Sequence, residues 1–596
     1  MTEKRLLLSG NEAIARGAYE SGVKVAAAYP GTPSTEILES LREYKGLHAE
    51  WAPNEKVALE TGMGAAFGGA RALVVMKHVG VNVAADPLFT LSYTGLRGGL
   101  VLVTADDPEM HSSQNEQDNR HYARFAKVPM LEPSDSQEAK DFTALAFELS
   151  EKFDTPVMLR TTTRVSHSKS IVSLKEPKVP PVQPKLTKEP MKFVMLPANA
   201  RKRHPVVEKR MEEMTRFAET FPENRIESRD SRVGIITSGI SYEYAKEIMP
   251  EASYLKLGMV YPLPAEMIRF FASRVERLFV VEELDPFLED QVRALGVEVS
   301  GKDLFPLCGE LTPGLVEKGV KGLSPAPEET SKGLPGRPPI MCPGCPHRGI
   351  FSILSKLKLF VTGDIGCYTL GFLPPLSAID TCVCMGASIG HAMGLDKALG
   401  EEALGRVVAV IGDSTFLHSG ITGLLNVVYN KGKVTLIILD NRTTAMTGRQ
   451  DHPGTGFTLQ GEETFQVDLA KLARGLGVKH VKVVNPYDLA ATERVIKREV
   501  RRPEPSVIIS RAACVLSRRE RGALEKSFCV DADLCVGCRT CLRLGCPAVK
   551  WIKEDGTEPQ GKKRKGRAAI EGFLCNGCTL CAQVCKCGAI KETDGK

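Results

Sequence analysis

Strand-length runs of apolar residues, each ending in Gly, Asp or Pro, recur through the first 165 residues of the chain. VKVAAAYPGTPSTEI (23–37) has the pattern of a strand, a turn and the start of a helix, and RALVVMKHVG (71–80) and GGLVLVTADDP (98–108) are further apolar runs. Unbroken apolar strands that alternate with helices are typical of parallel sheets, with loops at the strands' carboxyl ends. The pattern predicts an α/β domain over residues 1–170.

Changes in composition divide the rest of the chain. Residues 173–190 are rich in Pro and Lys, which predicts a linker or extended arm over 171–230. Apolar runs then resume in a smaller α/β unit at 231–325. After a Pro- and Gly-rich boundary, a second large α/β domain is expected at 326–522. Residues 523–596 show few regular patterns apart from their cysteines.

Composition and charge narrow the class of protein. Of 596 residues, 43% are hydrophobic and 25% charged, which is ordinary for a soluble globular chain. The net charge of +6 gives no reason to expect a nucleic-acid partner. The longest apolar runs are far shorter than a membrane span, and the first residues lack the apolar run of a signal peptide. We therefore expect a cytoplasmic protein without a membrane partner.

Cysteine is concentrated at one end of the chain. Ten of the 17 cysteines follow residue 528, in the runs CVGCRTCLRLGCP and CNGCTLCAQVC. Three cysteines at successive three-residue spacings can reach three irons of one cubane cluster, and a remote fourth serves the partner cluster in two-cluster ferredoxins. On this rule one [4Fe–4S] cluster is held by Cys535, Cys538, Cys541 and Cys585, and the other by Cys575, Cys578, Cys581 and Cys546.

Two departures and one alternative accompany this prediction. Four residues rather than three precede Cys546, and Lys586 replaces the usual proline. A zinc ribbon also uses C-x2-C pairs, but it rarely uses three cysteines at successive three-residue spacings. Cys529 and Cys587 remain as bystanders. The basic run at 561–567 is either a solvated loop or a docking patch for an acidic electron carrier.

A second pattern predicts a magnesium diphosphate site. Residues 406–441 show a strand, then Gly412-Asp413 with small polar residues, an amphipathic helix, a second strand and Asn441. Mg²⁺ prefers oxygen ligands, so Asp413 and Asn441 at two strand ends can bracket the ion. The helix that starts near Ser414 would point its N-terminus at the diphosphate. An ordinary strand–Gly-Asp–helix turn is the alternative.

The stretch NRTTAMTGRQ (441–450) is similar to the Asn-x-x-x-x-Met-Thr-Gly-x-Gln stretch of 2-oxoacid:ferredoxin oxidoreductases, which use thiamine diphosphate. In those enzymes the motif is Gly-Asp-Gly followed by a distant Asn, and Ser414 stands here in place of the second Gly. The resemblance implies that Asp413, Asn441 and the carbonyl of Thr443 bind Mg²⁺. It also implies further cofactor-binding residues, namely Gly412, Ser414, Thr415 and Met446. His418 and Arg449 flank the motif as weaker candidates.

CPGCPHRG (342–349) and GDIGCYTLG (363–371) also resemble this family, in which such cysteines bind a cluster next to the cofactor. The resemblance suggests a third, proximal cluster, for which free thiols are the alternative. We expect Cys382 and Cys384 to lie in the core instead. The candidate ligands of the proximal cluster are Cys342, Cys345, Cys367 and Cys514.

The first 90 residues resemble the N-terminal half of the same enzymes, in YPGTPSTEI, NEKVALETGMGAAFGGAR and MKHVGVNVAADP. Glu55 matches the glutamate that hydrogen-bonds the cofactor's aminopyrimidine and supports acid–base catalysis. Glu60 is the rival, and a simple helix-terminal charge is the other reading of Glu55. Thr32 matches a threonine that contacts the substrate carboxylate, although it could cap a helix. Lys77 and His78 either face the substrate or lie on the surface.

The order of the parts resembles that of the alpha subunits of indolepyruvate ferredoxin oxidoreductases, over essentially the whole chain. The resemblance implies two thiamine-diphosphate-binding domains, a smaller transketolase C-terminal-like domain and a ferredoxin-like domain with two clusters. It implies oxidative decarboxylation of aryl 2-oxoacids with CoA, which reduces ferredoxin. It also implies a separate small beta subunit and a dimer of alpha–beta pairs.

Three alternatives remain open at this point. The same chemistry could act on pyruvate or on branched-chain 2-oxoacids. A non-oxidative thiamine decarboxylase or synthase would share the cofactor domains but would not need the cysteine-rich end. A pure electron-transfer protein would explain that end but not Asp413, Asn441 and Glu55. Nicotinamide chemistry is disfavoured, since no G-x-G-x-x-G follows a strand.

Overall fold

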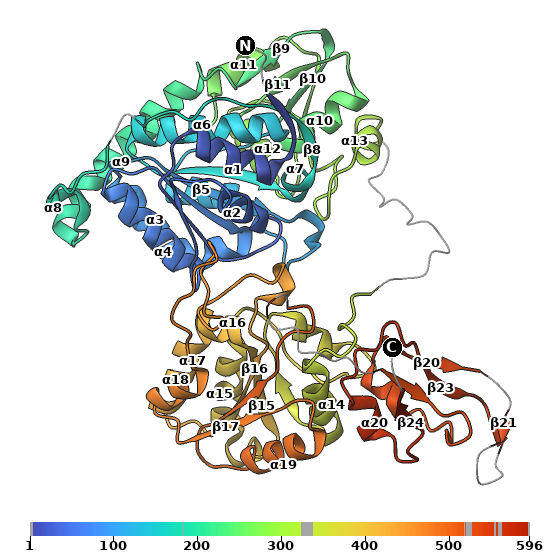
Figure 1. Ribbon diagram of the computed structural model, residues 1–596. Coiled ribbons are helices and arrows are strands. Elements are labelled where there is room, and N and C mark those ends of the chain that lie inside the picture. The colour runs from blue at the N-terminus through green and yellow to red at the C-terminus, as the bar shows by residue number, and fades with distance from the viewer. Residues whose placement is uncertain are drawn as a thin grey trace. The chain divides into compact units, whose positions relative to one another are not determined.

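The computed structural model describes residues 4–180, 183–322, 338–517, 519, 527–553, 556–557 and 563–593. The chain divides into two compact units, residues 1–332 and 333–596, which are shown in Figure 1 and described here one at a time. Of the basic run at 561–567, residues 561 and 562 lie outside the described residues. Among the described helices, none combines the length and the apolar character that a membrane crossing requires.

A seven-stranded sheet forms the centre of the first unit. Six of its strands are parallel, and the seventh, β12, is antiparallel at one edge. The helices α1 (Gly10–Glu20) and α6 (Ser136–Phe153) pack together, as do α3 (Glu55–Phe67) and α4 (His78–Thr94), and the two pairs cover opposite faces of the sheet (Figure 1). In sheet order the strands are β12 (Met259–Tyr261), β6 (Met130–Leu131), β7 (Val157–Thr162), β5 (Leu100–Asp106), β4 (Ala72–Lys77), β2 (Val25–Ala28) and β3 (His48–Trp51).

The strand order creates a switch point beside β2. β2 pairs with β3 on one side and with β4 on the other. The connection from β2 to β3 therefore runs in one direction across the sheet, and the next connection, from β3 to β4, runs back in the opposite direction. In open parallel sheets, ligands bind outside the carboxyl ends of strands at such a point. The loop after β2, the start of α3 and the end of β4 therefore surround the expected ligand position in this unit.

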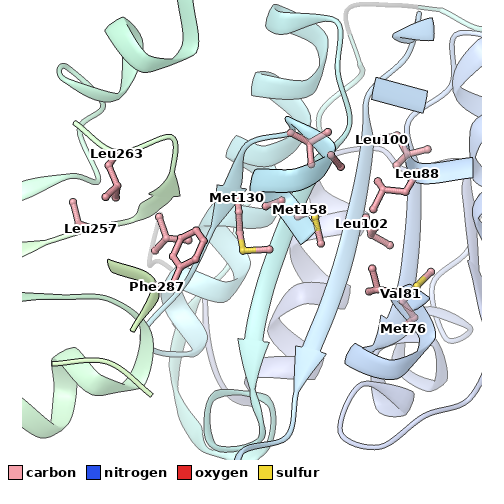
Figure 2. Packing of buried hydrophobic residues seen from close by; sticks show 14 of the residues in the cluster. Met76, Val81, Leu88, Leu100, Leu102, Met130, Met158, Leu257, Leu263 and Phe287 are labelled. Carbon is pink, nitrogen blue, oxygen red and sulfur yellow. The ribbon is translucent and has the colours of Figure 1, made fainter. Parts of the chain in front are cut away.

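The smaller α/β unit expected at 231–325 has its own four-stranded sheet but shares a core with the larger one. Its strands, in order, are β13 (Arg277–Val281), β10 (Asp230–Thr237), β11 (Ala252–Lys256) and β9 (Arg225–Glu227). The following strand, β12, joins the seven-stranded sheet through β6. Figure 2 shows Leu257, Leu263 and Phe287 of the smaller unit on the side of Met130 and Met158, and all five belong to one buried apolar cluster. The two sheets are thus joined by a continuous core.

The segment 171–230, expected as a linker or arm, is largely ordered structure. β8 (Lys169–Ser173) pairs with β1 (Arg5–Ser9), and the 22-residue helix α9 (Pro197–Ala218) packs against α4. Arg210 anchors α9 through hydrogen bonds to the carbonyls of Asp154, at 2.7 Å, and Ser92. The buried face of α9 combines Arg210 with Val207, Met214 and Ala218, so a charged residue interrupts its apolar stripe. The segment between β8 and α8 (Pro190–Phe193) has no regular element among its described residues.

The second unit contains a parallel five-stranded sheet. Polar residues follow three neighbouring strands of this sheet, and apolar side chains from its two faces belong to two buried clusters. The principal helices are α14 (His347–Leu357), α15 (Ala387–Leu399), α17 (Ile421–Tyr429), α18 (Leu469–Gly475) and α19 (Leu489–Glu499). The strands, in order, are β14 (Phe360–Thr362), β15 (Val407–Gly412), β16 (Thr435–Asp440), β18 (Ser506–Arg511) and β17 (His480–Val484).

Residues 527–593, here called the cysteine-rich segment, form the rest of the second unit as far as it is described. Two antiparallel pairs frame it: β19 (Phe528–Val530) with β24 (Ile590–Glu592), and β20 (Val549–Ile552) with β23 (Arg567–Ile570). The 3-10 turn η6 (Cys541–Leu544) and the helix α20 (Leu580–Val584) lie in contact with each other. Several cysteines belong to the buried cluster of this segment, so the packing depends on groups that can also bind metal.

Buried ion pairs join the two sheets of the first unit. Arg120 on α5 (Arg120–Ala126) donates to Asp118 and, at 2.6 Å, to Glu282 after β13, while Arg160 on β7 donates to Asp106 at 2.7 Å. All five side chains are buried. Burial raises the pKa of Asp106 to about 7, whereas the two guanidinium charges keep the pKa of Asp118 below its usual range despite burial. The network therefore links both sheets through charges that cannot easily be separated.

Replacing Arg120 tests this link. Arg120→Ala would leave Asp118 and Glu282 buried without their shared cation, and breaking a buried pair in this way costs about 3–5 kcal/mol. We expect a clearly lower urea midpoint of unfolding by circular dichroism. Arg124→Ala, which removes an exposed arginine from the same helix, is the matched control. Equal losses in the two variants would contradict the role of the buried network.

Candidate functional site

Asp413 and Asn441 leave the sheet of the second unit at the same edge. β15 and β16 are parallel neighbours, with Gly412 opposite Leu439, so the residues that follow both strands lie at their carboxyl ends. The Asp413 carboxylate is buried and accepts hydrogen bonds from the main chain of Ser414, at 2.8 Å, and of Arg442, at 2.7 Å. The structure thus brings together the two residues that the sequence separates by 28 positions.

The donor set at this edge fits a magnesium ion. Asn441 and Thr443 are buried next to Asp413, and the Asn441 side-chain oxygen lies 3.4 Å from the Thr443 nitrogen. A carboxylate, an amide oxygen and main-chain carbonyls are the ligands that Mg²⁺ accepts beside phosphate oxygens. Ser414 and Thr415 are also buried, at the start of the helix that follows.

That helix contains a π-helical turn. Residues Phe416–Gly420 connect α16 (Asp413–Thr415) to α17, and they place the buried His418 in the turn. Single π turns are frequent at functional sites. Two other candidates lie at the surface of this unit. Met446 is 54% exposed, and the exposed Arg449 donates to the carbonyl of Leu516 at 3.1 Å.

Two buried histidines beside the site were missed by the sequence reasoning. His347 Nε2 lies 3.4 Å from the Asn441 amide nitrogen, and His452 Nε2 lies 3.4 Å from Asp413 Oδ2. Burial lowers the pKa of His347 to about 4, with partial compensation from Asp413, so its ring is neutral at physiological pH. His347 stands inside the CPGCPHRG stretch, but nothing in a single sequence shows that this stretch folds against Asn441.

Asp364 and Tyr368 shape the same edge and were also missed. Asp364 follows β14 and accepts hydrogen bonds from the nitrogens of Gly386, at 2.9 Å, and Ser388, at 3.1 Å, where α15 begins. The Tyr368 ring leaves no room for a side chain at Gly412, since a Cβ there would lie 2.6 Å from the ring. The sequence did contain a signal for Asp364. Gly363-Asp364 follows an apolar strand, just as Gly412-Asp413 does.

Cys342, Cys345, Cys367 and Cys514 lie together near this edge. The Cys514 nitrogen donates to the carbonyl of Asn441 at 3.0 Å, which places the cysteine directly beside the candidate magnesium ligands. Burial raises the pKa of Cys345 to about 12, and the neighbouring thiols of Cys342 and Cys367 act in the same direction. Burial likewise raises the pKa of Cys367 to about 11, and the nearby thiols of Cys514 and Cys342 add to the shift. The structure therefore gathers cysteines from three separate stretches of the chain into one group.

The expectation that Cys382 and Cys384 lie in the core is wrong. Cys384 is exposed, and Cys382 is half-buried, with its thiol 3.4 Å from the carbonyl of Asp364. Both follow β14 in the irregular loop before α15, where the chain stays near the surface. Their apolar neighbours in the sequence gave a misleading signal.

The first predicted ligand set of the cysteine-rich segment lines a single cavity. Cys587, which the spacing had left as a bystander, also lines this cavity, and its sulfur lies 3.6 Å from that of Cys585. The ring of Trp551 and the apolar side chains of Val530 and Ile590 form other parts of the wall. The four predicted ligands in the wall are Cys535, Cys538, Cys541 and Cys585.

The second ligand set also meets in space. Burial raises the pKa of Cys581 to about 12, and the nearby thiols of Cys578, Cys575 and Cys546 add to the shift. Four thiolates around one zinc ion would lie about 3.8 Å apart, given a Zn–S bond of about 2.3 Å. Among the described residues, no three cysteine sulfurs lie within 4.8 Å of one another. No three of these sulfurs are therefore as close together as ligands of one zinc ion would be.

The second cysteine motif lies against the loop that carries Cys342 and Cys345. The Asn576 amide donates to the carbonyl of Pro343 at 2.8 Å, and the Tyr487 hydroxyl donates to the carbonyl of Gly344 at 2.8 Å. Gly344 has a positive φ of 67°, and a side chain there would overlap Asn576. Asn576 stands between Cys575 and Cys578, so the second motif is in direct contact with the proximal cysteine loop.

In the first unit, Glu55 lies at the switch point of the sheet. It is the first residue of α3, whose N-terminus is capped by the Asn54 side chain through the Val57 nitrogen at 2.9 Å. Glu55 is buried against Gly80, where an added Cβ would lie 2.8 Å from the Glu55 Cγ atom. The rival Glu60 is exposed and forms an ion pair with Lys56. Geometry therefore favours Glu55 as the functional carboxylate.

Lys77 and Thr32 lie at the same switch point. The Lys77 ammonium is buried and donates to the Ser112 carbonyl at 2.9 Å, and the Ser112 hydroxyl donates to the Thr32 carbonyl at 3.1 Å. Burial lowers the pKa of Lys77 to about 8, although the charges of Asp107 and Glu55 oppose the shift. The surface alternative for Lys77 is therefore wrong.

The alternatives for Thr32 and His78 are also resolved. Thr32 does not cap a helix, because Ser34 occupies that position before α2 (Thr35–Leu41). His78 is fully buried, with Nε2 3.1 Å from the Asn115 carbonyl, and burial lowers its pKa to about 4. His78 is thus neutral and does not lie on the surface.

Comparisons with known proteins match both units. The family model described as pyruvate flavodoxin/ferredoxin oxidoreductase, thiamine diP-bdg, covers residues 16–231, and that of the thiamine pyrophosphate enzyme C-terminal TPP binding domain covers 364–510. The indolepyruvate oxidoreductase subunits IorA of Archaeoglobus fulgidus and Pyrococcus horikoshii are 43% and 41% identical to the chain, over 99% of it and 97% of each relative. The chain belongs to the IorA family.

Membership of the IorA family confirms the enzyme class predicted from the sequence. The chain is the alpha subunit of a thiamine-diphosphate-dependent 2-oxoacid ferredoxin oxidoreductase. The 2-oxoglutarate synthase subunit KorA of Methanothermobacter thermautotrophicus is 25% identical over 52% of the chain and 95% of that relative. The predicted α/β architecture with thiamine-type domains is likewise confirmed.

The contact between Gly80 and Glu55 gives a test of the carboxylate. Gly80→Ala would displace Glu55, and loss of a positioned acid–base group reduces turnover about 10²–10⁴-fold. We expect such a loss in 2-oxoacid-dependent reduction of methyl viologen, with the secondary structure retained by circular dichroism. Gly64→Ala on α3, where a Cβ meets open space, is the control and should keep full activity. Normal activity of Gly80→Ala would contradict the role of Glu55.

Proposed function

We propose that this chain, with a separate small beta subunit, oxidatively decarboxylates aryl 2-oxoacids such as indolepyruvate and phenylpyruvate in the cytoplasm. CoA accepts the acyl group as an aryl-acetyl-CoA, CO₂ leaves, and ferredoxin receives the electrons. The full-length similarity to relatives named indolepyruvate oxidoreductase subunit IorA is the observation that supports both the aryl preference and the partner chain. We further propose a dimer of alpha–beta pairs.

The cofactor-binding roles follow from the two strand edges. Thiamine diphosphate, when bound, supplies the nucleophile and the electron sink for the oxoacid carbon. Asp413, Asn441 and the Thr443 carbonyl would hold the Mg²⁺ ion of its diphosphate, since they are buried oxygen donors at one edge. Glu55 would hydrogen-bond the aminopyrimidine and hold a proton there. The other groups proposed to contact the cofactor are Gly412, Ser414, Thr415 and Met446.

The substrate carboxylate would be bound at the switch point of the first unit. Thr32 and Lys77 lie together there through Ser112, and the Lys77 ammonium makes no ion pair with a described carboxylate. A buried cation without a paired anion is an effective site for an anionic group. Lys77 would therefore orient the 2-oxoacid through its carboxylate.

The three cysteine groups would each bind a [4Fe–4S] cluster. Thiolate ligation of such clusters carries single electrons, which suits a two-electron oxidation that reduces a one-electron acceptor. The Cys342 group touches the magnesium edge through Cys514 and Asn441, and the second cysteine motif touches the Cys342 loop through Asn576. These contacts support a path from the thiamine edge to the cysteine-rich segment.

The decisive experiment is an anaerobic assay of the chain with its small partner. CoA-dependent reduction of methyl viologen is measured with indolepyruvate, phenylpyruvate, pyruvate and 2-oxoisovalerate. We expect the aromatic acids to give the highest kcat/KM and the rate to vanish without thiamine diphosphate or CoA. A preference for pyruvate or the branched acid would refute the aryl assignment. Retention of full activity without CoA would refute the proposed product.

The ammonium group of Lys77 should make kcat/KM for the oxoacid depend on pH. The ammonium is charged below its pKa of about 8 and neutral above it, so kcat/KM for the oxoacid should fall as the pH rises through about 8. Lys77→Arg keeps its charge at high pH and should move this fall to higher pH, whereas Lys77→Met should raise KM at least about tenfold at pH 7. Unchanged KM in Lys77→Met would exclude the role.

A further inference from the structure

Arg348 lies between two of the cysteine groups of the second unit. It is the second residue of α14, three positions after Cys345, and only 2% of it is exposed to solvent. Its guanidinium donates to the carbonyls of Met341, at 2.8 Å, and Cys342, at 3.2 Å. These bonds hold the loop that carries the proximal cysteines.

The same guanidinium also holds the first cysteine motif. Arg348 Nη1 donates to the carbonyl of Leu544 at 2.6 Å, and Leu544 ends the turn η6 between Cys541 and Cys546. Gly545 follows with a positive φ of 67°, and a Cβ there would lie 3.2 Å from Arg348 Nη1 and 2.9 Å from Pro375. The unusual four-residue spacing before Cys546 therefore coincides with the turn that presents Leu544 to Arg348.

The charge of Arg348 has no carboxylate partner among the described residues. All three printed acceptors are neutral main-chain carbonyls, and Nε is buried without a hydrogen-bond partner. An unpaired buried charge is costly, and groups of this kind are normally paired. Cys345 on one side and Cys578 on the other are both close enough to feel the guanidinium charge.

An iron–sulfur cluster with four thiolate ligands carries net negative charge and would supply the missing counter-charge. The reduction potential of such a cluster depends on nearby charge, hydrogen bonding and solvent exposure. A buried cation acts strongly because the surroundings screen it little. It stabilises the more negative, reduced cluster and so raises its potential.

We propose that Arg348 is a positioning residue that ties the proximal cysteine loop to the cysteine-rich segment and raises the reduction potentials of the two flanking clusters. This inference rests on the clusters of the proposed function, namely the Cys342 group and the group of Cys546, Cys575, Cys578 and Cys581. Arg348 itself binds no iron. Its fork of donors sets the relative position of the loops, and its charge favours electron transfer out of the thiamine edge.

The test compares three variants of the full-length chain co-expressed with its partner. Arg348→Gln removes the charge, Arg348→Lys keeps the charge but loses the fork, and Arg543→Gln removes an exposed charge from the same turn as Leu544. Iron and sulfide content are measured first, followed by EPR-monitored redox titration of each cluster. Absence of iron in the wild-type protein would refute the proposed clusters, independently of Arg348.

With clusters present, we expect Arg348→Gln to shift at least one cluster to a more negative midpoint potential. Arg348→Lys and Arg543→Gln should leave the potentials close to those of the wild type. Full iron content with unchanged potentials in Arg348→Gln would overturn the proposal. If Arg348→Gln fails to assemble its clusters, recovery of iron in Arg348→Lys with potentials close to those of the wild type supports the role of the charge. Failure of both variants to assemble would show that the fork of donors is required and would overturn the role proposed for the charge.

Discussion

Strands β15 and β16 are joined by hydrogen bonds as a parallel pair, with Ala409 opposite Leu436 at one end and Gly412 opposite Leu439 at the other. This pairing brings Asp413 and Asn441 out of the sheet at one edge, and the remaining features of the second unit are arranged around it. The ring of Tyr368 packs against Gly412, and the carbonyl of Asn441 accepts a hydrogen bond from the Cys514 nitrogen. A register change in these two strands would therefore disturb both the candidate magnesium ligands and the proximal cysteines.

In the first unit, too, the pairing of parallel strands brings the candidate site residues together, although the strand order differs. There β2 lies between β3 and β4, and the switch point gathers Thr32 from the loop after β2, Glu55 from the start of α3 and Lys77 from the end of β4. Burial makes these groups chemically useful, because it depresses the pKa of Lys77 and fixes Glu55 against Gly80. In both units, parallel sheets supply position and the loops supply chemistry.

The short stretch from Cys342 to Arg348 connects the chemistry of the second unit. Its cysteines belong to the proximal group, His347 lies beside Asn441, and Arg348 reaches Leu544 in the cysteine-rich segment. Asn576 closes the contact from the other side. Because one loop and one helix start make all these contacts, the proposed roles in electron transfer and cofactor binding would share a single element.

Local pattern was sufficient for much of this protein. Apolar strands ending in Gly-Asp, the cysteine spacings and the NRTTAMTGRQ stretch predicted the α/β class, a thiamine site and two cluster ligand sets, and the α/β class with thiamine-type domains is confirmed. Helix α9 was missed because Arg210 interrupts its short apolar stripe, and Cys384 was misplaced because its apolar neighbours lie in a surface loop. The sequence by itself determined which residues are candidates for the chemistry, since ligand type and spacing are local properties. Only the tertiary structure decided that His347, His452 and Arg348 belong with them, because those contacts join residues far apart in the chain, and their energies depend on burial.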